Sequence, residues 1–295
     1  MPVPGAMTSA ERDLTGYGRN PPDPRWPDGA RLALSIVVNV EEGAELSLTS
    51  GDARNESVHE IREEVEGAPD PCMETHFAYG ARAGMWRILD LFDSFGVKAT
   101  FSSCGRAIAA TPALASEPAS RGHEVSAHGW RWERHAGMPE DTERAVIART
   151  VAAIQDATGA RPVGWHTRSA PSVNTRRLLI EEGGFLYDSD AYDDDLPRML
   201  QVSGRQHVIM PYAFDTNDMR FSPGGGFVQP EDFSRYCIAG FDWLLREGRT
   251  APKMMSIGLH CRIVGRPGKM AGLERFLKYA LSHKQVWFAD RKSVV

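Results

Sequence analysis

Carboxylates and histidines follow several apolar segments of this chain, at the point where each segment ends. Glu41 and Glu42 come directly after "RLALSIVVNV", His128 follows "HEVSA", and His260 follows "KMMSIGL". Carboxylate and imidazole groups held together can take a proton from water and return one to a departing nitrogen. Each residue alone could be a solvated loop side chain or a core histidine. Their shared position predicts that Glu41, Glu42, His128 and His260 are catalytic.

Further polar and aromatic side chains stand close to the same segment ends. Arginine gives planar, bidentate recognition of carboxylate or ureido oxygens. Tryptophan either packs in the core or walls a substrate pocket and excludes water. We expect His123 and His135 to be structural. The substrate-binding candidates are Arg82, Trp130, Trp132, His166, Arg168, Asn217 and Asp218.

The stretch "HGWRW" (128–132) bears on metal binding. Two histidines four residues apart could supply two metal ligands from one side of a turn, but the fourth position after His128 holds Trp132. Catalytic zinc sites usually have three protein ligands and a water. The residues alone leave open a metal site that lost one ligand, a different chemistry in the same place, or no site at all.

The segments around these residues alternate between strand-like and helix-like patterns. "RLALSIVVNV" is typical of a strand buried on both faces. Residues 81–95 place Met85, Ile88, Leu89 and Phe92 at helical spacing, and Gly96 follows as the predicted C-cap. Alternating units of this kind form a barrel or an open parallel sheet, and we favour an α/β fold with a distorted (β/α) barrel. In such a barrel the carboxyl ends of the strands converge on one face, where active sites lie.

The pattern predicts an irregular N-terminal arm over residues 1–30 and one catalytic domain over residues 31–295. Predicted helices cover 139–159, 173–182, 230–248 and 269–283. Predicted strands follow or precede them at 97–105, 123–130, 161–169, 185–190, 206–216, 253–260 and 285–290. The Gly-rich "PGGGF" does not lie between a strand and a helix, so it gives little support for a dinucleotide site.

Composition narrows the functional classes. The chain has 295 residues, of which 42% are hydrophobic and 25% charged, enough apolar material for a substantial core. The net charge is −5 and no Lys/Arg run stands out, so we expect no nucleic-acid or membrane partner. The start has no signal-peptide pattern, and no apolar stretch reaches membrane-spanning length. We expect a cytoplasmic protein.

The four cysteines are widely spaced and indicate neither a zinc knuckle nor a disulfide framework.

Several stretches together resemble the polysaccharide deacetylase (NodB-like) superfamily. They include "NVEEGAE", "YGARAG", "GHEVSAHGWRW", "RPVGW", "DTNDMRF" and "APKMMSIGLHCRIVGRPGKMAGLERF". Within the superfamily the chain is most similar to the metal-independent allantoinase group, which hydrolyses a cyclic ureide. The resemblance implies a distorted barrel with a groove at the strand ends, and a homo-oligomer such as a tetramer as the assembly.

The resemblance also implies roles for individual residues. In the metal-dependent deacetylases an acidic pair corresponds to Glu41 and Glu42, the first as base and the second as metal ligand. The two histidines of the metal motif fall on His128 and Trp132. The allantoinase group carries this tryptophan, which implies water activation without a metal, so we expect no metal. The alternative is a zinc or other divalent-metal site held by Glu42, His128 and His166. Glu41 would then be the general base, with His128 and His260 orienting water or protonating the departing nitrogen. Glu74 joins the substrate-binding candidates on the same ground.

Two departures from the group concern the substrate. Allantoinases read "NYEEGGE" and "GWYTGR", where this chain has Val40 and Ala44 in the first motif and His166, Thr167 and Arg168 in the second. We expect ring opening of a small cyclic ureide or imide. One alternative is metal-dependent N-deacetylation of a carbohydrate or peptidoglycan. Another is a catalytically inactive binding or assembly protein on the same scaffold.

Overall fold

The computed structural model describes residues 13–202 and 204–295. Within this part of the chain, nine strands form a single sheet in the order β6-β7-β5-β4-β3-β2-β1-β8, with β9 also paired to β1. All neighbouring strands are parallel except the β6–β7 hairpin. The strands are β1 (Leu32–Val40), β2 (Thr100–Ser103), β3 (Glu124–Ala127), β4 (Gly164–Trp165), β5 (Tyr187–Ala191), β6 (Arg198–Val202), β7 (Arg205–Pro211), β8 (Lys253–His260) and β9 (Val286–Phe288).

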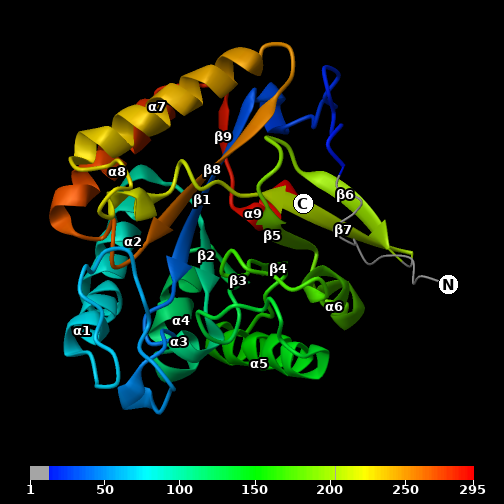
Figure 1. The fold of residues 1–295 in the computed structure, drawn as a ribbon. Coiled ribbons are helices and arrows are strands. Elements are labelled where there is room, and N and C mark those ends of the chain that lie inside the picture. Colours follow the sequence, from blue (N-terminus) through cyan, green and yellow to red (C-terminus); the bar gives the residue numbers. More distant parts are fainter. Residues whose placement is uncertain (1–12, 203) are drawn as a thin grey trace.

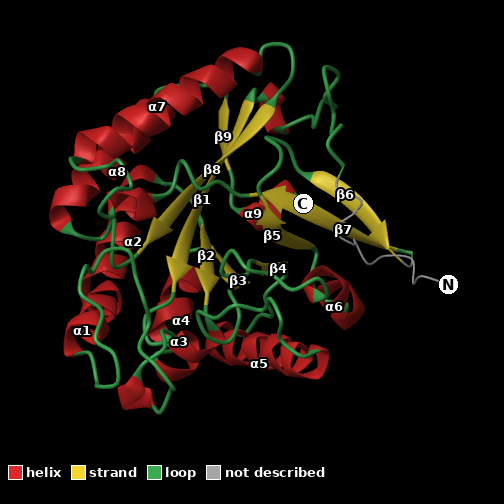
Figure 2. Cartoon of the chain, viewed as in Figure 1, coloured by secondary structure: helices red, strands yellow, loops and turns green. Residues whose placement is uncertain are grey.

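The sheet curls into a half-barrel with helices against its outer side (Figures 1 and 2). It does not close, because no strand pairs with the free edge of β8; the chain after β7 meets that edge only in an isolated bridge between Asn217 and Gly258. The helices are α1 (Pro71–Tyr79), α2 (Met85–Phe95), α3 (Gly105–Ala110), α4 (Ala113–Ser120), α5 (Glu140–Thr158), α6 (Thr175–Glu182), α7 (Pro230–Glu247), α8 (Pro267–Leu281) and α9 (Arg291–Val294).

Local sequence explains where several helices begin and end. Gly96 ends α2 in the left-handed conformation, with φ of 64°, which a glycine adopts without steric cost. Gln229 and Asp232 form a capping box at the start of α7. Between α1 and α2 the helix widens into one π-helical turn, Gly80–Gly84, so that α1 and α2 form one nearly continuous rod with a local bulge.

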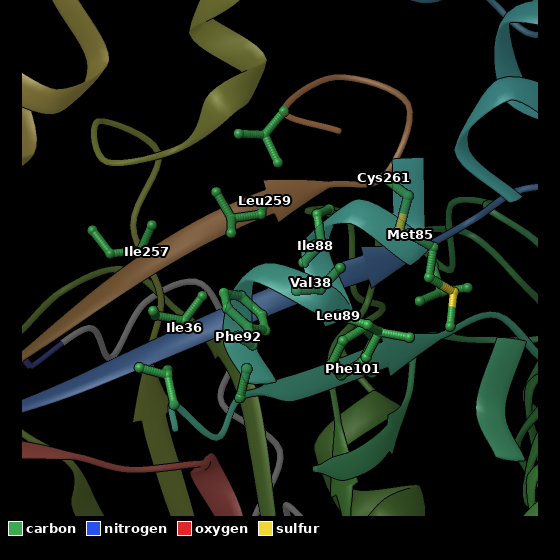
Figure 3. Close-up of a cluster of buried hydrophobic side chains, with 14 of the residues drawn as sticks. Ile36, Val38, Met85, Ile88, Leu89, Phe92, Phe101, Ile257, Leu259 and Cys261 are labelled. Atoms are coloured by element: carbon green, nitrogen blue, oxygen red, sulfur yellow. The ribbon is translucent and has the colours of Figure 1, made fainter. Parts of the chain in front are cut away.

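The outer face of the sheet carries the main hydrophobic core. Ile36 and Val38 of β1 pack with Ile257 and Leu259 of β8 against the α2 side chains, of which Phe92 is fully buried. Figure 3 shows these side chains meeting between the strands and the helix. Burial of each large apolar side chain contributes about 1.5–3 kcal/mol to stability. The core therefore fixes the positions of the strands whose ends carry the candidate site.

The inner face of the same strands is largely polar. Successive side chains of a strand alternate between faces, so Ser35 and Asn39 point inward beside the outward Ile36 and Val38. The paired strands repeat the pattern, with Ser256 beside Ser35 in the β1–β8 register. All five residues of this comparison are buried. The inward-facing stripe ends at the carboxyl edge of the sheet, where the catalytic candidates lie.

The predicted α/β fold is confirmed, with the sheet a curled half-barrel instead of a closed barrel. The elements that were not predicted include α1, β6 and the short helix α9. The helix α1 begins ten residues before the predicted helix, and the chain between β5 and β7 adds the antiparallel strand β6. Polar side chains on the exposed side of α1 and β6 hide their periodicity. No helix in the described ranges is long and apolar enough to cross a membrane.

Part of the predicted N-terminal arm, residues 1–12, lies outside the residues that the structure describes. Its described part runs along the domain surface (Figure 1). Tyr17 donates a hydrogen bond to the carbonyl of Pro197, and the Trp26 indole donates to the carbonyl of Lys253. Trp26 is buried and contacts Trp287 of β9. The second half of the arm is thus packed onto the domain.

Candidate active site

Glu41, directly after β1, lies at the centre of the site. Its carboxylate is 1% exposed, and its Oε2 accepts a 2.5 Å hydrogen bond from Nη1 of Arg262. Its Oε1 lies 3.4 Å from Nε2 of His128 and 3.5 Å from Nε2 of His260. Burial would raise the pKa of Glu41, but the positive charges of Arg262 and His260 outweigh it and hold the pKa well below its usual range. Glu41 is an ionised carboxylate with one oxygen between two imidazoles.

The second carboxyl of the pair, Glu42, turns toward the helical layer. Its Oε2 accepts a hydrogen bond from the backbone N–H of Glu41, and its Oε1 has no partner among the described residues. Gly80 packs directly on Glu42, since a Cβ at that position would lie 2.0 Å from Oε1. Burial, together with the charge of Glu41, raises the pKa of Glu42 to about 7. The π-helical turn at Gly80 thus permits a buried carboxyl that keeps its proton below neutral pH.

His260, the last residue of β8, forms a pair with Asp218. Nδ1 of His260 lies 2.6 Å from Oδ1 of Asp218, whose Oδ2 accepts hydrogen bonds from the backbone N–H of His260 and Val264. Burial would lower the pKa of His260, but the carboxylates of Glu41 and Asp218 outweigh it and raise the pKa to about 10. His260 is therefore an imidazolium at neutral pH, and its Nε2 offers a proton toward Glu41.

His128 is oriented by the backbone of a neighbouring strand end. Its Nδ1 lies 2.6 Å from the carbonyl oxygen of His166, and a carbonyl can only accept, so Nδ1 carries the hydrogen. In the neutral ring the lone pair is then on Nε2, which faces Glu41. The next residue, Thr167, holds this strand end in place by donating two hydrogen bonds to Asp190.

Trp132 occupies the position of the second histidine in the metal motif. The ring is 6% exposed, packs against Phe77 of α1, and has the Arg168 guanidinium 3.5 Å from its centroid. Arg168 is itself held by Glu56 at 3.0 Å and by the carbonyl of Trp132. Arg262 also lies near this ring, 5.3 Å from the Trp132 centroid. The tryptophan therefore forms an apolar wall of the site beside two cations.

The donor set does not fit a divalent metal ion. Arg262 places a full positive charge on Glu41, where a second cation would be repelled. The rings of His128 and His166 are stacked, with centroids 5.0 Å apart and planes 23° from parallel. Lone pairs lie in the ring plane, so those of two stacked imidazoles do not converge on one ion. Within residues 13–202 and 204–295, no group of three or more His, Cys, Asp and Glu side chains could hold a metal.

Several predicted substrate-binding residues lie elsewhere or have another role. Trp130 is directed toward α5, where Arg149 covers its ring, and is not part of the site. Glu74 at the start of α1 accepts a hydrogen bond from Ser47, and Arg82 is exposed on the π-helical turn. Asn217 caps a short 3₁₀ helix, Asp218–Phe221. Only Trp130 is turned away from the site, and substrate contact by Glu74, Arg82 and Asn217 stays a prediction. The position of a residue at a strand end does not fix the direction of its side chain, which depends on the local turn.

Sequence reasoning missed two members of the site. Arg262 is completely buried and also donates a hydrogen bond to Glu60. Burial would raise the pKa of Glu60, but the charge of Arg262 outweighs burial and lowers the pKa to about 2. Tyr212 follows β7, accepts a hydrogen bond from Asn39, and packs on His166 with centroids 4.4 Å apart. A signal existed for Arg262, which stands two residues after the catalytic candidate His260, in the turn that follows β8.

Comparison with known proteins places this geometry in a family. The polysaccharide deacetylase family model matches residues 66–182. A curated protein of Schizosaccharomyces pombe, named a putative polysaccharide deacetylase, is 37% identical over 96% of this chain and 95% of its own length. The chain belongs to the polysaccharide deacetylase family. This confirms the superfamily resemblance that the sequence motifs indicated.

Two solved structures extend the comparison to the whole polysaccharide deacetylase fold. One, described as a probable polysaccharide deacetylase from Pseudomonas aeruginosa PAO1, is 46% identical, covers 96% of both chains, and superposes with a TM-score of 0.92. The other, described as Puue allantoinase, is 45% identical, covers 97% of this chain and 96% of its own, and has the same TM-score of 0.92. As a family member, the chain is a hydrolase of carbon–nitrogen bonds.

Proposed function

We propose that this family member opens a small cyclic amide, a ureide or an imide, by hydrolysis without a metal. The observation that carries the proposal is the group around Oε1 of Glu41. An ionised carboxylate oxygen lies between two imidazole nitrogens, at 3.4 Å from His128 and 3.5 Å from His260, while Arg262 binds the other oxygen. Two proton acceptors, Glu41 and His128, and one proton donor, His260, therefore lie around the same carboxylate oxygen. The similarity to an allantoinase structure supports the choice of substrate class.

The first half of the proposed reaction is attack by water on the ring carbonyl. Water bonded to Glu41 and His128 gives up a proton to this pair of acceptors while its oxygen bonds to the carbonyl carbon. Arg262 keeps Glu41 ionised and fixes its orientation. Positioned acceptors of this kind contribute about 10²–10⁴-fold to a rate. Glu42 supports Glu41 by accepting the hydrogen bond of its backbone N–H.

The second half is cleavage of the carbon–nitrogen bond. The ring nitrogen leaves with the bonding electron pair and needs a proton, which the imidazolium of His260 supplies from Nε2. The Asp218 carboxylate stabilises that imidazolium and fixes which nitrogen faces the site. The proton taken from water then returns to His260. The products are an open-chain amide or urea nitrogen and a carboxylic acid, which releases its remaining proton to solvent and leaves as a carboxylate.

Activity on a panel of rings tests the proposal. Allantoin, hydantoin, dihydrouracil and succinimide are incubated with purified protein of measured metal content, with and without a chelator. We expect ring opening of at least one compound, unchanged by the chelator and absent in Glu41→Gln. No turnover of any ring by folded protein would contradict the proposal and support an inactive binding scaffold.

Metal-dependent N-deacetylation is the second candidate, because the family model and two similar proteins carry deacetylase names. It requires a cation beside Glu42 and His128. The distinguishing measurement is release of acetate from N-acetylated chitin or peptidoglycan fragments. Acetate release that is lost on chelation and restored by zinc would favour this candidate over ring opening.

A further inference from the structure

The catalytic groups are closed off from solvent. Glu41 is 1% exposed, and His128 and His260 are each 3% exposed. A substrate of ring size cannot reach Oε1 of Glu41 unless a side chain at the edge of the site moves. The group that moves must contact the buried residues on one side and solvent on the other.

A continuous series of rings connects the buried histidines to the surface. His166 stacks on His128, and Tyr212 packs on His166 at 4.4 Å. The Tyr192 hydroxyl lies 3.3 Å from Nε2 of His166, and Phe214 stacks on Tyr192 with centroids 4.1 Å apart and planes within 6°. Exposure rises along the series, from 5% for His166 to 36% for Tyr192 and 55% for Phe214.

A large cavity meets the outer end of this series. It has a volume of about 1350 Å³ and lies at the open seam of the half-barrel, between the described part of the arm, the β6–β7 hairpin and α7. Tyr192, Tyr212 and Phe214 all line it. The same three aromatic side chains therefore lie between this cavity and the buried His166 and His128.

We propose that Tyr192 and Phe214 are specificity-determining residues that admit a flat, uncharged ring from the seam cavity to the catalytic histidines. The inference rests on the proposed ring-opening function and names how that substrate is selected. Phe214 is held mainly by one stacked face, and exposed side chains change rotamer within nanoseconds. A planar amide ring can take the place of Phe214 on Tyr192, because the amide ring and the Phe214 ring each offer a flat π-surface to the Tyr192 ring.

The charges around the cavity favour an uncharged ring over an anionic one. Its lining includes two cationic side chains and five carboxylates, the latter being Asp13, Asp193, Asp194, Asp195 and Asp215. A cavity lined mainly by one sign of charge repels ligands of that sign. The carboxylate product of ring opening would leave such a cavity readily, and a ring that already bears a carboxylate would enter it poorly.

Steady-state kinetics on the most active ring of the panel provide the first test. We expect Tyr192→Leu, which removes the stacking surface for the substrate, to raise KM about 3- to 10-fold, and Phe214→Ala, which removes the competing ring, to lower KM by about the same factor, with kcat within about 2-fold in both. Phe214→Tyr, which restores a flat ring, should return KM to the wild-type value. Trp243→Ala is the matched control, because Trp243 is an exposed aromatic residue of the same cavity that does not stack on Tyr192.

The charge preference has its own comparison. Dihydrouracil and dihydroorotate share one ring and differ by a carboxylate. We expect the wild-type protein to prefer dihydrouracil in kcat/KM, and added salt to reduce the preference by screening. An equal kcat/KM for the two rings at low salt would contradict selection of an uncharged ring.

The second test does not need enzymatic activity. Diethyl pyrocarbonate modifies neutral imidazoles, and burial with the nearby His128 lowers the pKa of His166 well below its usual value, so this ring is neutral. We expect Phe214→Ala to increase the modification rate of His166, mapped by mass spectrometry, about 3- to 10-fold. The rate at His207, which is 1% exposed and bonded to Asp188, should not change.

The two tests separate the two proposals. Faster modification of His166 in Phe214→Ala, with no turnover of any ring, would support control of access by Tyr192 and Phe214 (the gate) and overturn the ring-opening function. Ring opening with an unchanged KM and an unchanged His166 rate in Phe214→Ala would overturn the gate alone. Equal increases at His166 and His207, or an equal effect of Trp243→Ala, would indicate general loosening and would also overturn it.

Discussion

The two faces of the β1 strand have different composition and different roles. Outward, Ile36 and Val38 lie in the hydrophobic core against α2 (Figure 3). Inward, Ser35 and Asn39 lead to Glu41 at the strand end, and all are buried. The outer face supplies stability and holds the strands in register. The inner face has few large apolar contacts and supports the chemistry.

This comparison teaches that burial alone does not tell a core position from a functional one. All nine residues of β1 are buried, yet only alternate ones belong to the main core. Buried polar residues form hydrogen bonds in the interior: Nδ2 of Asn39 donates to the Tyr212 hydroxyl and to the carbonyl of Leu259. Substitutions on the two faces should therefore separate activity from stability.

The largest effect is expected on the inner face, at Glu41→Gln. The amide cannot accept a proton from water and does not neutralise Arg262. We expect kcat to fall about 10²–10⁴-fold, with a circular dichroism spectrum like that of the wild type. Stopped-flow or end-point assays of ring opening provide the measurement. Wild-type turnover by this variant would remove Glu41 from the mechanism.

On the outer face, Ile36→Ala should have the next largest effect, and it should be on stability. Ile36 is 1% exposed in the main core, and such truncations cost about 2–5 kcal/mol in the free energy of unfolding. Urea denaturation measures this cost. The kcat of the folded fraction should equal that of the wild type. A large loss of kcat would mean that the outer face also shapes the site.

A smaller change is expected from Asp218→Asn, seen in pH dependence. Burial lowers the pKa of His260, but Glu41 and Asp218 raise it to about 10, so the proton is lost as pH rises through that value. The stability from this raised pKa is complete below about 6.5, the unfolded value, and disappears as pH rises through about 10. In Asp218→Asn the alkaline limb of kcat should move to lower pH.

The magnitude of the Asp218→Asn effect distinguishes a proton donor from a structural residue. We expect kcat at neutral pH to fall about 10- to 100-fold, less than for Glu41→Gln, since Glu41 still supports the imidazolium. A pH–rate profile from pH 5 to 10.5 provides the measurement. A uniform loss of activity without a shifted alkaline limb would contradict the role of His260 as donor.

The smallest effect is expected at Ser35→Ala, on the inner face directly beside Ile36. The Ser35 hydroxyl has no hydrogen-bond partner among the described residues, so its removal leaves no partner unsatisfied. We expect the free energy of unfolding to change by less than about 0.5 kcal/mol. The two adjacent alanine variants form a matched pair on one strand. Similar losses in both would remove the distinction between the faces.

Much of the fold could be predicted from local sequence. The helical spacing of Met85, Ile88, Leu89 and Phe92 corresponds to the buried face of α2, and Gly96 ends it as expected. The strand-end positions of Glu41, His128 and His260 correctly brought these residues together, because parallel strands place their carboxyl ends on one edge. His123 and His135 lie outside this cluster, bonded to Ala99 and Glu143.

Other assignments depend on directions that spacing does not encode. Trp130 and Trp132 are two residues apart in one irregular loop, yet one packs toward α5 and the other walls the site. Asp218 was expected to contact substrate and instead pairs with His260 from a distant segment. The turn after a strand sets such directions, and many turns are compatible with the same local sequence.

The sequence by itself determined the alternation of elements, the residues at the strand ends and the replacement of a metal-motif histidine by Trp132. Periodicity and residue type carry this information locally. The tertiary structure alone decided that Arg262 neutralises Glu41, that Asp218 raises the pKa of His260, and that the half-barrel stays open at a seam lined by Tyr192 and Phe214. Charge, burial and access depend on side chains that lie far apart in the chain and meet only after folding.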